Sequence, residues 1–161
     1  MARLLIIWHS RTGGSEAMAQ AAFAGASDEA EVVLQRAHDA TPADLLAADG
    51  YLFACPENLA SMSGTMKEFF DRCYYPLLGQ IEARPYAAMI CAGSDGEGAA
   101  RQIARICTGW RLKPVAEPLI VLTGAQSADA IAAPKVIAER DLARCRDLGA
   151  LVGAGLAMGV F

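Results

Sequence analysis

The hydrophobic residues of this chain gather in short unbroken runs, separated by segments with helical spacing. Leu4 to Ile7 is the first run, and its lack of alternation is typical of a strand that is buried on both faces. Four later segments of similar length predict four further strands, at residues 31–35, 50–55, 86–92 and 119–122. The chain therefore predicts five short strands.

Between these runs the apolar residues recur at helical intervals. The clearest case is residues 62–75, where Met62, Met66, Phe69, Phe70 and Cys73 form one stripe and the charged residues lie mostly off it. Helices are also predicted for residues 16–22, 41–46 and 99–109, and for a stretch from near Pro134 past Leu148. The Gly/Ala-rich tail after Leu151 is assigned no definite structure.

Strands that alternate with helices predict an α/β fold in which a parallel sheet is covered on both faces. The length of 161 residues fits a single domain spanning residues 1–161. In such sheets ligands bind beyond the carboxyl ends of the strands, where the strand order reverses. With the strand order 2-1-3-4-5, the loops after strands one, three and four meet at one edge. These are residues 10–15, 56–61 and 93–98.

The first of these loops has the composition of a phosphate cradle. Ser10, Thr12 and Ser15 supply hydroxyl groups, while Gly13 and Gly14 let the backbone approach a ligand closely. The helix that follows offers unpaired N–H groups and the positive end of its dipole. The simpler interpretation is that these residues only cap and turn, and the convergence of three unusual loops argues against it.

Several nucleotide and phosphate sites are excluded by the same loop. It lacks the GxxxxGK[ST] motif of P-loop NTPases and the GxGxxG motif of dinucleotide folds. The strand ends also lack the acidic residues of a receiver domain, and the loop lacks the cysteine of a low-molecular-weight phosphatase. The remaining candidate ligand is a mononucleotide whose phosphate lies on residues 10–15.

Composition argues against several classes of binding partner. A net charge of −4 without a basic cluster argues against nucleic acid, and no apolar run is long enough to cross a membrane. Five scattered cysteines without CxxC spacing, and only two histidines, make a metal site unexpected. Because Met1-Ala2-Arg3 leads directly into a strand, we expect no signal peptide and a cytoplasmic location.

Two motifs resemble the flavodoxin superfamily. SRTGGS (residues 10–15) fits the flavodoxin phosphate pattern of hydroxyl-x-Thr-Gly-x-hydroxyl. PENLASMSGTMKEFFDR (residues 56–72) is similar to the segment after strand three in NAD(P)H-dependent FMN reductases and flavodoxin-like quinone reductases. The resemblance covers essentially the whole chain and implies a flavodoxin-like three-layer sandwich.

The resemblance also implies a cofactor and its site. FMN would be bound through its phosphate and its isoalloxazine ring by Ser10, Arg11, Thr12, Gly13, Gly14, Ser15, Pro56, Glu57, Asn58, Leu59, Ala60, Ala92, Gly93, Ser94, Asp95 and Gly96. The family usually has Gly where Ala60 stands, and Ala restricts the peptide flip that Gly allows. No catalytic side chain is nominated, because a flavin carries out the redox step itself.

The implied activity is electron transfer from NAD(P)H through FMN to a quinone, a flavin or a similar small acceptor. The alternative is a non-enzymatic electron carrier of the flavodoxin type that docks on redox partner proteins. The chain is only mildly acidic, and aromatic residues are not evident in the loops that would flank FMN. Both features favour the enzyme. Family members of this size are commonly dimers or tetramers, which makes a homodimer or homotetramer a candidate assembly.

Overall fold

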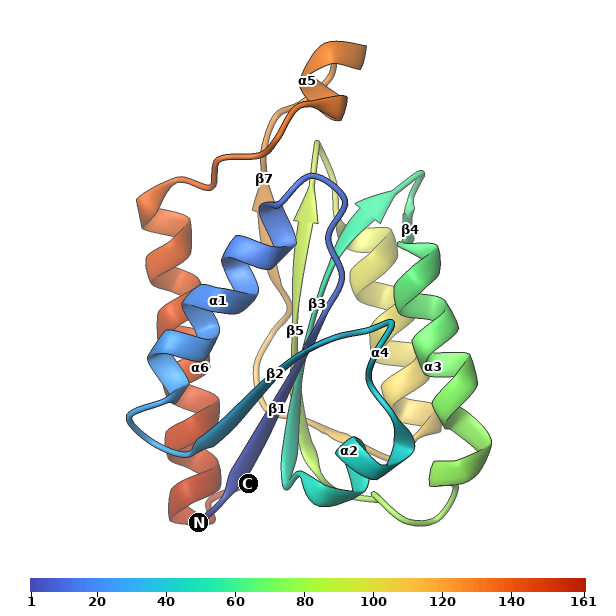
Figure 1. The fold of residues 1–161 in the computed structure, drawn as a ribbon, viewed down its shortest axis with the longest axis vertical. Helices are drawn as coiled ribbons and strands as arrows, with labels where there is room; N and C mark the ends of the chain where they lie inside the picture. Colours follow the sequence, from blue (N-terminus) through green and yellow to red (C-terminus); the bar gives the residue numbers. More distant parts are fainter.

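A computed structural model describes residues 1–161 as a parallel sheet between two layers of helices (Figure 1). The strands are β1 (Arg3–Trp8), β2 (Glu31–Arg36), β3 (Gly50–Asn58), β4 (Ser61–Met62), β5 (Pro85–Ala92), β6 (Lys113–Pro114) and β7 (Leu119–Leu122). The helices are α1 (Gly14–Ala26), α2 (Pro42–Ala47), α3 (Gly64–Leu77), α4 (Glu97–Gly109), α5 (Ala128–Ala132) and α6 (Glu139–Met158).

The sheet has the predicted strand order. β2, β1, β3 and β5 lie side by side in parallel, and β7 pairs with β5 in parallel beyond them. In chain order of the five predicted strands this is 2-1-3-4-5. Two short strands are additions: β6 also pairs with β5, and β4 runs antiparallel to the end of β3. The flavodoxin-like sandwich is therefore confirmed.

The strands divide the interior into two hydrophobic cores. Along β1, Leu5 and Ile7 face the core under α2, α3 and α4, while Leu4 and Ile6 face the core under α1 and α6. All four side chains are essentially inaccessible to solvent. A strand buried on both faces needs an apolar residue at every position, which explains the unbroken run in the sequence.

The C-terminal segment differs from the prediction. The last helix begins at Glu139 rather than near Pro134, and it continues through the Gly/Ala-rich tail to Met158. Small residues allow α6 to pack closely on α1: a Cβ on Gly149, just before the tail, would lie 2.0 Å from the Ala22 carbonyl oxygen, and one on Gly153, within the tail, 3.2 Å from that of Ala26. The tail is thus a packed helix whose composition reflects close contact between helices.

No helix in the structure combines the length and the apolar character needed to cross a membrane.

Candidate functional site

The three predicted loops line one cavity at the carboxyl end of the sheet. Its volume is about 660 Å³, which lies within the range of cofactor pockets. Ten of the predicted residues line it: Arg11, Thr12, Pro56, Glu57, Asn58, Leu59, Ala60, Ala92, Gly93 and Ser94. The structure therefore brings the ends of β1, β3 and β5 together as the strand order requires.

Six predicted residues do not line this cavity: Ser10, Gly13, Gly14, Ser15, Asp95 and Gly96. Conversely, the sequence reasoning missed seven lining residues: Cys91, Thr123, Ala125, Gln126, Ile131, Ala132 and Lys135. Most of these follow β7, the last strand of the sheet. The predicted order already placed this strand next to β5, and a parallel strand ends at the same edge, so the segment after β7 could have been included in the predicted site.

The first loop, residues 10–15, turns tightly around the hydroxyl group of Ser10. The backbone N–H of Gly13 donates to Ser10 Oγ at 2.9 Å, and Gly13 has a φ of 96°, which favours glycine. Gly14 lies against the end of β5, where an added Cβ would come within 2.6 Å of Cys91 Sγ. The two glycines therefore have separate roles, one in the turn and one in packing.

The first turn of α1 has no side-chain partner. Ser10 accepts the N–H of the N-cap residue Gly13, but no side chain accepts the N–H groups of Gly14, Ser15 or Glu16. Ser15, in its first turn, is only 2% exposed, and its Oγ is the one buried side-chain oxygen or nitrogen with no hydrogen-bond partner. Since a buried unpaired hydroxyl costs stability, a ligand with acceptor oxygens is the natural partner for this group. The positive end of the helix dipole favours an anion there.

The second loop is a hairpin with a strained tip. Asn58 pairs with Ser61 across the turn, and the two residues between them, Leu59 and Ala60, have φ values of 53° and 63°. Positive φ at both central residues is the requirement of a type I′ turn, which usually contains Asn or Gly. Leu59 is also fully exposed at the cavity. This turn is thus held in a conformation that its residues disfavour.

Helix α4 holds this hairpin in place. The Glu57 carboxylate accepts hydrogen bonds from the N–H groups of Gly96 and Ala99, at 2.9 and 3.0 Å, and so caps α4. Gln102 Oε1 accepts the Met62 N–H at 2.8 Å. Gly98 is so close that an added Cβ would lie 2.2 Å from the Ala60 carbonyl oxygen. The first turns of α4 therefore fix both strands of the hairpin and its tip.

His9 links the first loop to the second. Its Nδ1 lies 2.7 Å from the hydroxyl oxygen of Ser63, which is buried at the start of α3. Burial lowers the pKa of His9, and the nearby Arg11 charge lowers it further. His9 does not line the cavity. Its observed contact is thus structural and joins two of the site's walls.

The cysteine thiols are not activated. All five are buried and unpaired. Burial raises the pKa of Cys55 to about 12, and burial likewise raises the pKa of Cys91 at the cavity wall, which the Lys135 charge partly opposes. Because the thiolate is the reactive form, neither residue is suited to act as a nucleophile at neutral pH.

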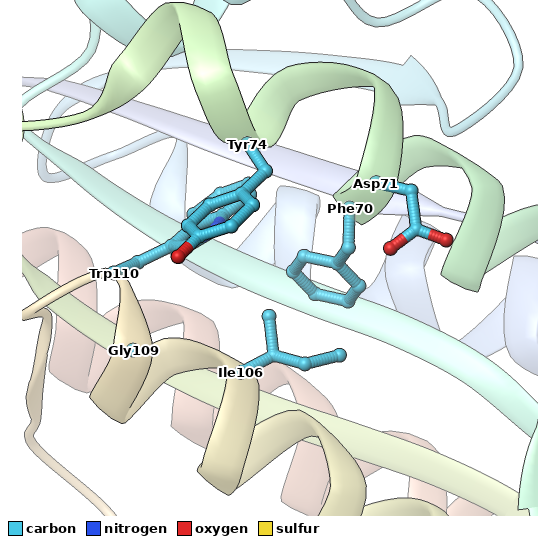
Figure 2. Close-up of a pocket in the computed structure, with 6 residues that line it drawn as sticks. All are labelled: Phe70, Asp71, Tyr74, Ile106, Gly109 and Trp110. Carbon is cyan, nitrogen blue, oxygen red and sulfur yellow. The ribbon is translucent and has the colours of Figure 1, made fainter.

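A second, smaller hollow of about 240 Å³ lies between α3 and α4 (Figure 2). It is lined by Phe70, Asp71, Tyr74, Ile106, Gly109 and Trp110. These residues lie from the middle of α3 onward and at the C-terminal end of α4, whose C-cap is Trp110, away from the loops at the carboxyl edge. The rings of Phe70 and Trp110 pack edge to face, with their centroids 5.3 Å apart. The hollow is lined by no cationic side chain, and the carboxylate of Asp71 disfavours an anion there.

Comparison with known proteins gives the family. The model of the NADPH-dependent FMN reductases matches residues 25–126. This chain therefore belongs to the NADPH-dependent FMN reductase family, within the flavodoxin-like proteins. A flavodoxin of Aquifex aeolicus is 35% identical over 100 residues, covering 61% of this chain and 54% of that protein. The chain thus spans about half the length of this curated relative.

Solved structures agree on the fold. A flavodoxin from the domain Archaea superposes with a TM-score of 0.78 at 18% identity, covering 96% of this chain and 98% of that one. A WrbA-like flavodoxin from Agrobacterium tumefaciens gives 0.73 at 22% identity, with 99% of both chains covered. Rubredoxin oxygen:oxidoreductase of Desulfovibrio gigas gives 0.78 at 15% identity, covering 98% of this chain and 37% of that protein.

Proposed function

We propose that residues 1–161 form a single FMN-binding unit that passes electrons from NAD(P)H through FMN to a quinone, a flavin or a similar small acceptor. The observation that carries the proposal is the unpartnered start of α1, where the Ser15 hydroxyl is buried without a hydrogen bond. Arg11 and Thr12, just before this helix, line a cavity of cofactor size, and the chain belongs to the FMN reductase family.

In this proposal the phosphate of FMN binds residues 10–15. The hydroxyl groups of Ser15 and Thr12 and the N–H groups of the first turn of α1 donate hydrogen bonds to it. Arg11, which lines the cavity and is exposed, adds a positive charge. The phosphate would thereby satisfy the buried hydroxyl of Ser15, and the loop would orient one end of the cofactor.

The flavin ring would lie between residues 56–60 and residues 92–96. Glu57 and Gln102 fix the backbone of the first of these segments through α4, so its peptide groups are in place before the cofactor binds. FMN supplies the hydride chemistry when bound, and the chain positions the ring and limits the access of water. No side chain at the cavity is placed as a general base.

The alternative is an electron carrier that exchanges electrons with a protein partner. The observation that favours it is the 35% identity to a protein named flavodoxin. The two candidate functions share the cofactor site and differ in the electron donor, so the donor decides between them.

The test is to load the purified protein with FMN, remove oxygen, add NADPH or NADH, and follow the flavin absorbance. Rapid bleaching supports the reductase, and the NADPH and NADH rates then define the donor. Flavin that stays oxidised with both nucleotides, but is reduced by dithionite or by a protein donor, supports the carrier. If FMN does not bind, both functions fail.

A further inference from the structure

The segment after β7 adds a wall to the cavity that the three loops do not account for. Residues 123–135 leave the last strand, form the short helix α5 beyond the carboxyl end of the sheet, and return toward α1 (Figure 1). Gln126, Ile131 and Lys135 of this segment line the cavity. Lys135 is the only charged residue among them.

Backbone contacts place Lys135 beside the phosphate loop. Its N–H donates to the carbonyl oxygen of Thr12 at 2.7 Å. Its Cβ lies 3.4 Å from the position that a Cβ on Gly14 would occupy, at the first residue of α1. Lys135 is therefore fixed next to the helix start that has no partner of its own.

The ammonium group of Lys135 is oriented but not neutralised. Its Nζ donates to the carbonyl oxygens of Ile131 and Ala133, at 2.7 and 2.6 Å. One of its three N–H bonds is left for a further acceptor. No carboxylate lies within salt-bridge distance, although acidic residues outnumber basic ones in the chain. A half-buried, unpaired cation at the wall of a cavity attracts an anionic ligand.

We propose that Lys135 binds the phosphate monoester of FMN, so that the segment after β7 closes on the phosphate loop as a fourth wall of the site. This inference rests on the proposed function. The phosphate of a nicotinamide dinucleotide has the same chemistry, but the contacts of Lys135 with Thr12 and Gly14 favour the phosphate of the resident cofactor.

The experiment compares the dissociation constants of FMN and riboflavin by titration calorimetry, because riboflavin lacks only the phosphate. Lys135→Met is expected to weaken FMN binding about tenfold, which corresponds to about 1.4 kcal/mol, and to leave riboflavin binding within about twofold. Lys135→Arg should restore most of the FMN affinity. The salt dependence of FMN binding should also be shallower in Lys135→Met.

Lys113→Met is the matched control, since Lys113 is exposed on β6, away from the cavity. Circular dichroism and thermal unfolding establish that each variant folds. Equal weakening of FMN and riboflavin by Lys135→Met would overturn the proposal and assign Lys135 to holding the wall. Unchanged FMN affinity combined with a raised KM for NADPH relative to NADH would overturn it in favour of a dinucleotide phosphate. Absence of FMN binding by the unmodified protein would instead refute the proposed function.

Discussion

Two helices begin at the same edge of the sheet with nearly the same geometry, and only one of them is capped by a carboxylate. Both α1 and α4 follow a glycine with left-handed φ, 96° at Gly13 and 90° at Gly96. The start of α4 receives the Glu57 carboxylate, at the N–H groups of Gly96 and Ala99. The start of α1 receives only the neutral hydroxyl of Ser10, at the N–H of Gly13. A positive helix end attracts an anion in either case. At α4 the anion belongs to the protein, and at α1 we propose that it belongs to the ligand.

This difference separates the tasks of the two loops. The hairpin of residues 56–62 is held by the protein, so it can keep the unfavourable backbone of Leu59 and Ala60. The loop of residues 10–15 leaves a buried hydroxyl unsatisfied and therefore gains most from a bound phosphate. The following predictions test this comparison, beginning with the largest expected effect.

Gly98→Ala should separate the hairpin from α4. The added Cβ would lie 2.2 Å from the Ala60 carbonyl oxygen, so backbone must move. We expect a loss of about 3 kcal/mol in the free energy of unfolding, measured by urea denaturation, and weaker FMN binding. Gly109→Ala in the same helix meets no atom within 4 Å and should gain about 0.5–1 kcal/mol. Equal effects of the two variants would contradict the contact.

Glu57→Gln should weaken the cap of α4. The two carboxylate oxygens each accept one backbone N–H, whereas an amide has one acceptor oxygen and no charge. We expect a loss of about 1.5 kcal/mol and faster amide hydrogen exchange within residues 57–62. Glu97→Gln is the control, because Glu97 is exposed in the same first turn, and it should cost at most about 0.5 kcal/mol.

Replacing the two buried serines, Ser63 and Ser15, by alanine should change the stability of the FMN-free protein in opposite directions. Ser63→Ala removes the partner of His9 and should lower the stability of the FMN-free protein by about 1 kcal/mol. Ser15→Ala removes an unpaired hydroxyl and should raise it by about 0.5–1 kcal/mol, while weakening FMN binding about fivefold to tenfold. A loss of stability in Ser15→Ala would show that the hydroxyl already has a partner.

Ala60→Gly should relieve the backbone strain at the hairpin tip. Ala60 has a φ of 63°, which glycine adopts at little cost, so the variant should be more stable by about 0.5 kcal/mol. Ala83→Gly provides the match: Ala83 has a φ of 66° and does not line the cavity. Both variants should gain stability, but only Ala60→Gly should shift the midpoint potential of bound FMN. A shift in both would argue against a local effect.

The smallest effect is a dependence on pH. The folded protein lowers the pKa of His9 from 6.5, so the folded state binds fewer protons than the unfolded state in this range. The contribution of neutral His9 to the free energy of unfolding should therefore be fully present above pH 6.5 and be lost as the pH falls through the lowered pKa. His9→Gln should flatten this part of the stability–pH curve, and His38→Gln, at an exposed position, should leave its slope in place. An unchanged slope in His9→Gln would refute the assignment.

Local sequence was sufficient for the strands and for the edge at which the site lies. The runs in β1, β3 and β5 are apolar at every position because helices cover both faces of the sheet, and that pattern identifies a parallel sheet directly. The start of α2 could also be predicted from local sequence, because its N-cap Thr41 and Asp44 form a complete capping box within four residues. Features that depend on residues close together in the chain, such as a capping box, can be recognised from the sequence.

Other features were decided by contacts between distant segments. Nothing near Glu57 in the sequence shows that its carboxylate caps a helix about 40 residues later, and nothing near Lys135 shows that it reaches Thr12. The tail after Leu151 continues α6, and Gly153 within it lies against Ala26 of α1, a contact that the composition of the tail does not specify. The sequence by itself determined the strands and the loops that follow them, and the resemblance to flavodoxins implied the order of the strands. Only the tertiary structure decided which helix start was filled by the protein and which was left for a ligand, because hydrogen bonds and close packing depend on where distant residues meet in space.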